Sequence, residues 1–192
     1  MDSRTIMKPP VHSTMKAKTL ESAKESGPSA DQLSIEIETA MGESWLPALY
    51  RDRILTLRTR SYVFPAPVSR RIKQPPIEIQ HTLLGIELKV GQRRMLCPDL
   101  ATARYLAVFA RAGCGAIAIP YDITRISHLA DELESSWHRM LLLADSLTGD
   151  RGEAFATRVR SLLIGKVRAA IDRAGAGTRI PEFNQSTKQG RR

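Results

Sequence analysis

The chain has few aromatic residues, two cysteines and no long apolar run, and each of these shortages makes some classes of protein less favoured. Aromatic residues make up 5% of the 192 residues, which leaves little for the base-stacking strands of common RNA-binding domains. Cys97 and Cys114 form no CxxC pair, so we expect buried free thiols in a reducing cytoplasm. No apolar run approaches the roughly 20 residues that a membrane span needs. With 42% hydrophobic residues, the composition favours a cytoplasmic globular protein without a membrane partner.

Motifs that carry common chemistry are also missing. The chain contains no GxGxxG, GxxxxGK[ST], GxSxG or HExxH pattern. His128 lies one helical turn from Glu132 and three residues from Asp131, but the sequence offers no further ligand, so no metal or cofactor is expected. Asp122 follows a predicted strand, where catalytic groups of α/β folds collect, yet a helix cap is a sufficient role for it.

Positive charge is abundant and unevenly distributed. The formal net charge is +9, and arginine outnumbers lysine 21 to 8. Residues 51–73 hold seven basic residues against one acidic residue, and residues 151–192 hold ten against three. An excess gathered in two blocks favours a binding surface over a generally basic exterior, and the planar guanidinium suits phosphate. A genome rich in G and C would produce the same arginine bias.

Composition divides the chain into four parts. Residues 1–28 are rich in Ser, Lys and Pro and are expected to form a disordered arm. Residues 29–44 form a short helix that opens with a capping box at Ser29 and ends at Gly42. Residues 45–175 form a single domain that begins with an apolar anchor, Trp45. Residues 176–192 form a basic tail.

The periodicity of the domain predicts an α+β fold. A small, mostly antiparallel sheet of strands near 54–64, 77–90, 93–97 and 116–120 is covered by one short helix, 99–112, and by a long antiparallel helical hairpin. The first helix of the hairpin has an apolar stripe spaced alternately by three and four residues: Ile123, Ile126, Ala130, Leu133, Trp137, Met140, Ala144 and Leu147. The second helix runs over 153–174, after a glycine-containing turn.

The stretch IELKVGQRRMLCPD contains both halves of a metal-dependent nuclease signature, PD and ExK, in reversed order. Glu87-Leu88-Lys89 precedes Pro98-Asp99, whereas that signature places the acidic residue first. Asp99 has another role available, as the cap of the helix that starts at Leu100. The reversed order disfavours a catalytic nuclease.

Interpreted as a hairpin, the same stretch predicts a specific register. Gly91-Gln92 suits a two-residue turn, which opposes Lys89 to Arg94. Ile86, Leu88, Met95 and Cys97 then share a buried face, while Glu87 faces solvent opposite Leu96. Like charges directly opposed destabilise a strand pair, so an anion bridging them would remove a penalty. We therefore expect the tip of Lys89, Arg93 and Arg94 to contact phosphate; the alternative is a solvated turn.

Other basic residues extend this prediction. Arg58 and Arg60 lie on the outer face of strand 54–64, near Tyr62 and Phe64, the only candidates for stacking a base; the alternative for these two rings is a place in the core. The linker after this strand carries further cations, and the last helix presents a second basic surface. The alternative for the last helix is a solvated face balanced by Glu132 and Glu134. These additional candidates are Arg70, Arg71, Arg158, Lys166 and Arg168.

The sequence favours a non-enzymatic nucleic-acid-binding or nucleoprotein accessory protein that contacts phosphate through arginine-rich surfaces. The alternative is an adaptor or assembly factor that binds an acidic protein, or a second copy of itself, through its helical hairpin and tails. A homodimer of this kind would use an exposed part of the 123–147 stripe. An enzyme would instead require Glu87, Lys89, Asp99 and Asp122 to converge in one pocket.

Overall fold

The computed structural model describes residues 27–65 and 76–177. Along the chain its elements are α1 (Ala30–Met41), η1 (Gly42–Ser44), α2 (Leu46–Leu49), η2 (Tyr50–Ile54), β1 (Thr59–Val63), β2 (Ile77–Thr82), β3 (Gly85–Val90), β4 (Arg93–Cys97), α3 (Leu100–Ala112), β5 (Ala116–Pro120), α4 (Ile123–Thr148), η3 (Gly149–Arg151) and α5 (Glu153–Ala174). The predicted N-terminal arm, Arg70, Arg71 and nearly all of the predicted tail lie outside the described residues.

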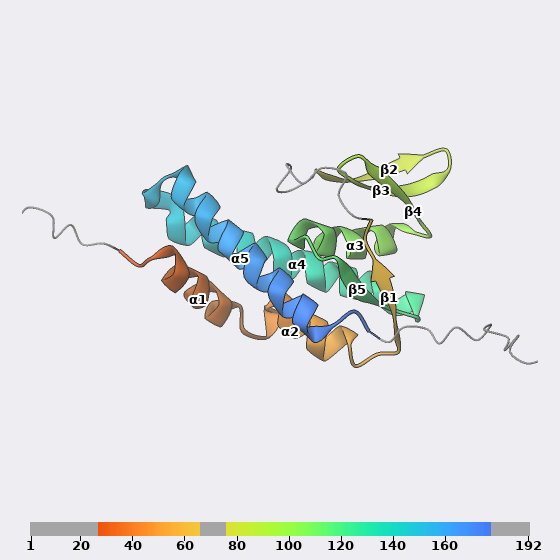
Figure 1. Ribbon diagram of the computed structural model, residues 1–192, viewed down its shortest axis with the longest axis horizontal. Helices are drawn as coiled ribbons and strands as arrows, with labels where there is room; N and C mark the ends of the chain where they lie inside the picture. Colours follow the sequence, from red (N-terminus) through yellow and green to blue (C-terminus); the bar gives the residue numbers. More distant parts are fainter. Residues whose placement is uncertain (1–26, 66–75, 178–192) are drawn as a thin grey trace, which may run out of the picture.

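The α+β class and the helical hairpin are confirmed. α4 and α5 run side by side along the long axis, and α1 packs against both (Figure 1). The interior of the predicted α4 stripe is buried, from Ile126 to Ala144, whereas its end residues Ile123 and Leu147 are exposed. This stripe is therefore filled by contacts within the chain, and little of it is left for a partner.

The described strands form two antiparallel sheets rather than the one sheet expected. β2, β3 and β4 form a three-stranded sheet that packs on α3, while β1 pairs with β5 alone among the described strands. The Tyr62 hydroxyl donates to the Met95 sulfur at 3.0 Å, which connects the two sheets. β5 is buried along most of its length, as its wholly apolar sequence predicts.

The sequence predicts that the first strand starts at residue 54, and this position is wrong. The chain forms a π-helical turn, η2, over Tyr50–Ile54, and the strand begins only at Thr59. Ile54 is buried as part of that turn. Ile54 therefore packs as the end of a helical turn and residues 55–58 connect that turn to β1, because a short apolar segment satisfies both periodicities.

Local signals at the helix ends are confirmed. The Ser29 hydroxyl accepts from the Gln32 amide at 3.2 Å, and the Gln32 side chain accepts from the Ser29 amide at 2.7 Å, which completes the capping box. Asp99 accepts from the Thr102 amide at 2.6 Å and thus caps α3. Gly113 ends α3 with a φ of 74°, a conformation that favours glycine. Trp45 is buried in the core, as expected.

The predicted hairpin register is also confirmed. β3 and β4 pair Val90 with Arg93 and Lys89 with Arg94, as a turn at Gly91 requires. Leu88 and Cys97 are buried on the shared face, and Met95 and Ile86 are half-buried beside them. Leu100, the first residue of α3, is exposed.

Candidate functional site

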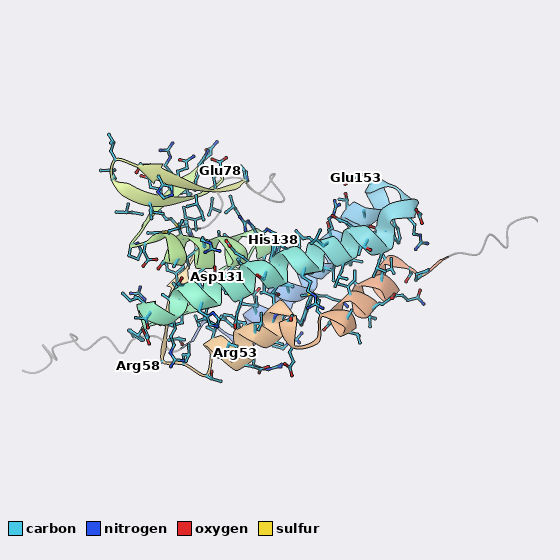
Figure 2. The ribbon with its side chains drawn as sticks, turned by 180° about the vertical axis from the view of Figure 1, so that it is seen from behind. Arg53, Arg58, Glu78, Asp131, His138 and Glu153 are labelled. Atoms are coloured by element: carbon cyan, nitrogen blue, oxygen red, sulfur yellow. The ribbon has the colours of Figure 1, made fainter. Side chains whose placement is uncertain are left out.

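The predicted basic residues lie in three separate places. Arg58 lies at the end of the molecule where α4 begins, while Glu78 marks the three-stranded sheet and Glu153 the start of α5 (Figure 2). Glu153 lies toward the other end of the long axis from Arg58. The basic residues of β1, of the hairpin tip and of α5 therefore do not form one continuous surface in the described residues.

At the hairpin, carboxylates offset the two opposed cations. Lys89 lies 3.1 Å from the Glu78 carboxylate on β2, and Arg94 lies 3.7 Å from the Glu87 carboxylate. The prediction that Glu87 faces solvent is wrong, because its side chain is only 11% exposed and accepts from the Thr82 hydroxyl at 3.3 Å. These ion pairs remove the penalty that motivated a bridging anion. Of the three tip cations, only Arg93 has no carboxylate within 4.0 Å among the described residues.

The last helix is also partly neutralised, though by other acids than Glu132 and Glu134. Arg160 binds Asp145 at 2.7 Å and Glu153 at 3.0 Å, and Lys166 binds Glu38 of α1 at 3.2 Å. Arg158 and Arg168 are exposed and have no carboxylate at ion-pair distance in the described ranges. Glu134 instead binds Arg104 of α3, because α4 turns that face toward α3.

The residues around the start of β1 form a different environment. The Arg58 guanidinium lies over the Tyr121 ring, 5.1 Å from its centroid, and Tyr121 is 41% exposed. Arg53, on η2, lies at the same end of the molecule (Figure 2). Arg53, Arg58 and Arg60 are exposed, and within the described parts of the chain none forms an ion pair. We refer to Arg53, Arg58, Arg60 and Tyr121 as the arginine surface.

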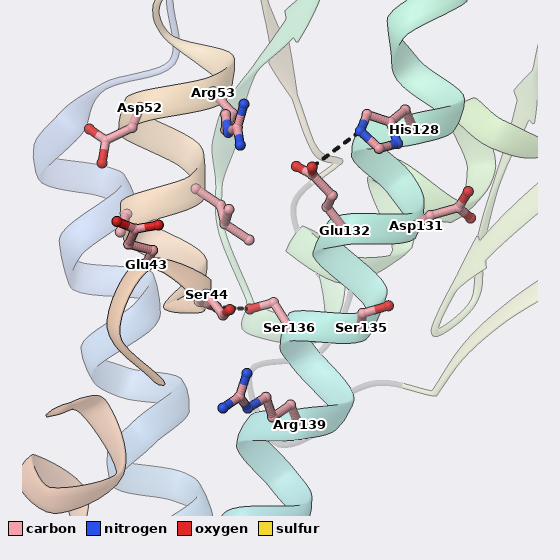
Figure 3. A pocket seen from close by; sticks show the side chains of 12 residues that line it. Glu43, Ser44, Asp52, Arg53, His128, Asp131, Glu132, Ser135, Ser136 and Arg139 are labelled. Atoms are coloured by element: carbon pink, nitrogen blue, oxygen red, sulfur yellow. Dashed lines mark hydrogen bonds and ion pairs between the residues drawn. The ribbon is translucent and has the colours of Figure 1, made fainter. Parts of the chain in front are cut away.

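A cleft of about 660 Å³ adjoins this surface, between the α2–η2 segment and α4 (Figure 3). Arg53 belongs to both the arginine surface and the lining of the cleft. The cleft is lined by residues far apart in the sequence: Glu43, Ser44, Ala48, Leu49, Asp52, Arg53, His128, Asp131, Glu132, Ser135, Ser136 and Arg139.

The walls of the cleft carry both signs of charge. The His128 Nε2 lies 3.2 Å from the Glu132 carboxylate, and the Arg53 side chain points toward this pair from the opposite wall (Figure 3). Below them the buried Ser136 hydroxyl donates to the Ser44 carbonyl at 2.6 Å. Asp131 points away and binds Arg104 at 2.8 Å. A cleft with this mixture does not select strongly for a polyanion.

The sequence indicated only part of this cleft. The spacing of His128 and Glu132 predicts their contact, but nothing local places η2 opposite them. The four residues that an enzyme would have required do not line the cleft. Asp99 caps α3, and Asp122 caps α4, where hydrogen bonds from Thr124 lower the pKa of its carboxyl group. Among the described residues, no three His, Cys, Asp or Glu side chains gather as metal ligands do.

Three titratable groups are buried in the core: Tyr50, Tyr105 and Cys114. Burial raises the pKa of Tyr50 to about 12 and that of the Cys114 thiol to about 12, and it raises the pKa of Tyr105 well above its usual value. Cys97 and Cys114 are free and buried, as predicted. Such thiols are poorly reactive, because the nucleophile is the thiolate.

No protein-family profile, curated protein or solved structure matches the chain. Within residues 27–65 and 76–177, every helix falls short of the length and apolarity required to span a membrane.

Proposed function

We propose that the protein binds nucleic acid, without sequence specificity, through the arginine surface. The observation that supports this role is the contrast among its cations. Lys89, Arg94 and Lys166 are neutralised by carboxylates, whereas Arg58 and Arg60 are exposed and unpaired among the described residues, and Arg58 lies over the Tyr121 ring. An unpaired guanidinium releases condensed counterions when it binds phosphate, which favours association with a polyanion.

The pair of Arg58 and Tyr121 suits a single strand in particular. Arginine planes and tyrosine rings both stack unpaired bases, and the guanidinium retains N–H groups for a phosphate. Gly177, the last described residue, lies against Thr59, which is next to Arg58 in sequence.

Binding of the full chain to a fluorescent single strand and to a duplex, measured by anisotropy between 50 and 300 mM salt, tests the proposal. We expect log Kd to rise linearly with log salt and single-strand binding to be at least as tight as duplex binding. Arg58→Ala/Arg60→Ala should reduce the salt slope by about 1.4, since each of the two lost phosphate contacts removes about 0.7 on single strands. A flat salt response, or no binding at 50 mM salt, would refute the function.

A matched double variant separates a local surface from bulk charge. Arg158→Ala/Arg168→Ala on α5 removes the same formal charge from exposed positions far along the sequence. We expect this variant to bind more tightly than Arg58→Ala/Arg60→Ala. Equal losses in the two variants would indicate non-specific attraction by net charge, and a larger loss on α5 would move the interface to that helix.

One observation supports the adaptor role as a second candidate. Leu83 and Leu84 form the turn between β2 and β3 and are almost fully exposed, and Leu96 is exposed beside Gly85. Hairpin turns are usually polar, and a cluster of exposed leucines marks an interaction site. Leu83→Ser/Leu84→Ser should abolish capture of a protein partner if the turn binds one and leave capture unchanged if it does not, while nucleic-acid affinity is unaffected in either case.

A further inference from the structure

The sheet of β1 and β5 has two edges, and one of them is closed by tyrosines. The Ala118 amide on β5 donates to the Tyr50 hydroxyl at 2.8 Å, and the Tyr105 hydroxyl donates to the Ala118 carbonyl at 2.6 Å. The outward-pointing amide and carbonyl of Ala118 are therefore both hydrogen-bonded to tyrosine hydroxyls, and they are not available to a further strand. The sheet cannot extend beyond β5.

The outer edge of β1 is open within the described residues. The Tyr121 amide donates to the Arg58 carbonyl and the Phe64 amide to the Gly115 carbonyl, at the two ends of the β1–β5 ladder. The direction of the backbone N–H and C=O groups alternates along an antiparallel strand. The backbone groups of Arg60 and Tyr62 therefore also point toward β5. The amides and carbonyls at the three positions between them point outward, and none bonds to described backbone: Thr59, Ser61 and Val63.

We propose that a second copy of this chain pairs with this edge, so that two β1 strands lie antiparallel with Ser61 opposite Ser61. The pairing brings together outward-pointing groups only, Thr59 with Val63 and Ser61 with itself, which forms six hydrogen bonds across a two-fold axis. The result is a continuous four-stranded sheet in the order β5, β1, β1, β5. This inference goes beyond nucleic-acid binding and does not depend on it.

The side chains favour this register over its neighbours. With Ser61 at the centre, Arg60 lies opposite Tyr62 of the second copy, an arrangement that permits a cation–π contact. Val63, 70% exposed in the single chain, is covered beside Thr59 of the second copy. A shift by two residues in one direction opposes Arg60 to Arg60, which is repulsive. A shift in the other direction opposes Tyr62 to Tyr62 and places Arg60 opposite Phe64, which is buried and offers little ring surface to the guanidinium.

The mass of the full chain in solution tests the proposal. A five-residue strand pair is a small interface, so we expect dissociation in the micromolar range. Sedimentation equilibrium between about 1 and 200 µM should show the mass rising from 21.3 kDa toward twice that value. A single chain at every concentration would overturn the proposal. Nucleic-acid binding is measured at nanomolar protein, so the two proposals fail separately.

Variants at the edge locate the contact. Ser61→Pro removes an outward N–H that has no partner in the single chain, so it should spare the fold and weaken the dimer about tenfold or more. Ser61→Ala keeps the N–H and should dimerise normally. Val63→Glu changes an exposed position, so it should fold. It places a carboxylate in the dimer interface and should weaken the dimer, which provides a second test if Ser61→Pro does not fold. A dimer that persists in folded Val63→Glu with unchanged affinity would refute pairing through β1.

Discussion

The Tyr50 hydroxyl provides a direct test of how the β5 edge is held. Tyr50 is fully buried; its hydroxyl accepts from the Ala118 amide at 2.8 Å and donates to the Gly175 carbonyl at 2.7 Å. Tyr50→Phe keeps the ring and its edge-on contact with Phe109, 5.5 Å between centroids, but removes both hydrogen bonds. The variant therefore measures the contribution of the two hydrogen bonds separately from the packing of the ring.

The expected cost follows from the groups left behind. Ala118 is wholly buried, so its stranded amide costs about 1–3 kcal/mol, while the half-buried Gly175 carbonyl can be hydrated and costs less. We expect Tyr50→Phe to reduce the free energy of unfolding by about 2–3 kcal/mol and Tm by roughly 4–12 °C. Urea denaturation at pH 7, followed by circular dichroism, measures this change.

A matched control makes the reasoning refutable. Tyr62→Phe removes a half-buried hydroxyl whose acceptor is the Met95 sulfur, so no backbone group is stranded. Its cost should be below about 0.5 kcal/mol, because sulfur is a weak acceptor. If Tyr50→Phe costs no more than Tyr62→Phe, then the hydroxyl does not hold the β5 edge.

Three further predictions concern the cap of α3, the cleft and alkaline pH. Asp99→Ala should reduce the free energy of unfolding by about 0.5–2 kcal/mol, measured by urea denaturation, because the Thr102 amide loses its acceptor; Asp99→Ser should retain most of the stability. Ser136→Ala should cost about 1 kcal/mol in the same assay, since the Ser44 carbonyl loses a buried donor, and an unchanged midpoint would contradict this contact. Burial raises the pKa of the Cys114 thiol from 9.0 to about 12, so its contribution is complete below pH 9 and is lost as pH rises toward 12. Urea midpoints at pH 7, 9 and 10 should therefore fall less in Cys114→Ala than in the natural chain.

Features set by nearby residues could be predicted from the sequence. The register of β3 and β4 follows from a two-residue turn at Gly91, and α4 follows from an apolar stripe that recurs without interruption. The caps Ser29 and Asp99 act on amides three residues away. In each case, the interaction that determines the structure lies within one turn or one hairpin.

Features set by distant residues could not be predicted in this way. Lys89 is neutralised by Glu78, a contact that depends on the register of β2 against β3 and not on the hairpin alone. The division into two sheets depends on β1 choosing β5 as its partner across more than 50 residues. The cleft requires η2 to lie opposite α4, and the stacking of Arg58 on Tyr121 requires that same β1–β5 pairing. Sequence periodicity contains no information on such partners.

The packing of α1 against α5 has a consequence for the order in which the fold can form during synthesis. α1 is made first among the described helices and α5 last, yet Lys166 binds Glu38 and Arg151 donates to the Pro28 carbonyl. Until α5 is complete, the apolar face of α1 that contains Leu33 and Ile37 lacks part of its cover. A nascent or truncated chain without α5 therefore exposes that face, and such surfaces are recognised by chaperones and prone to aggregate. Synthesis and packing of α5 are thus the steps that cover the apolar face of α1.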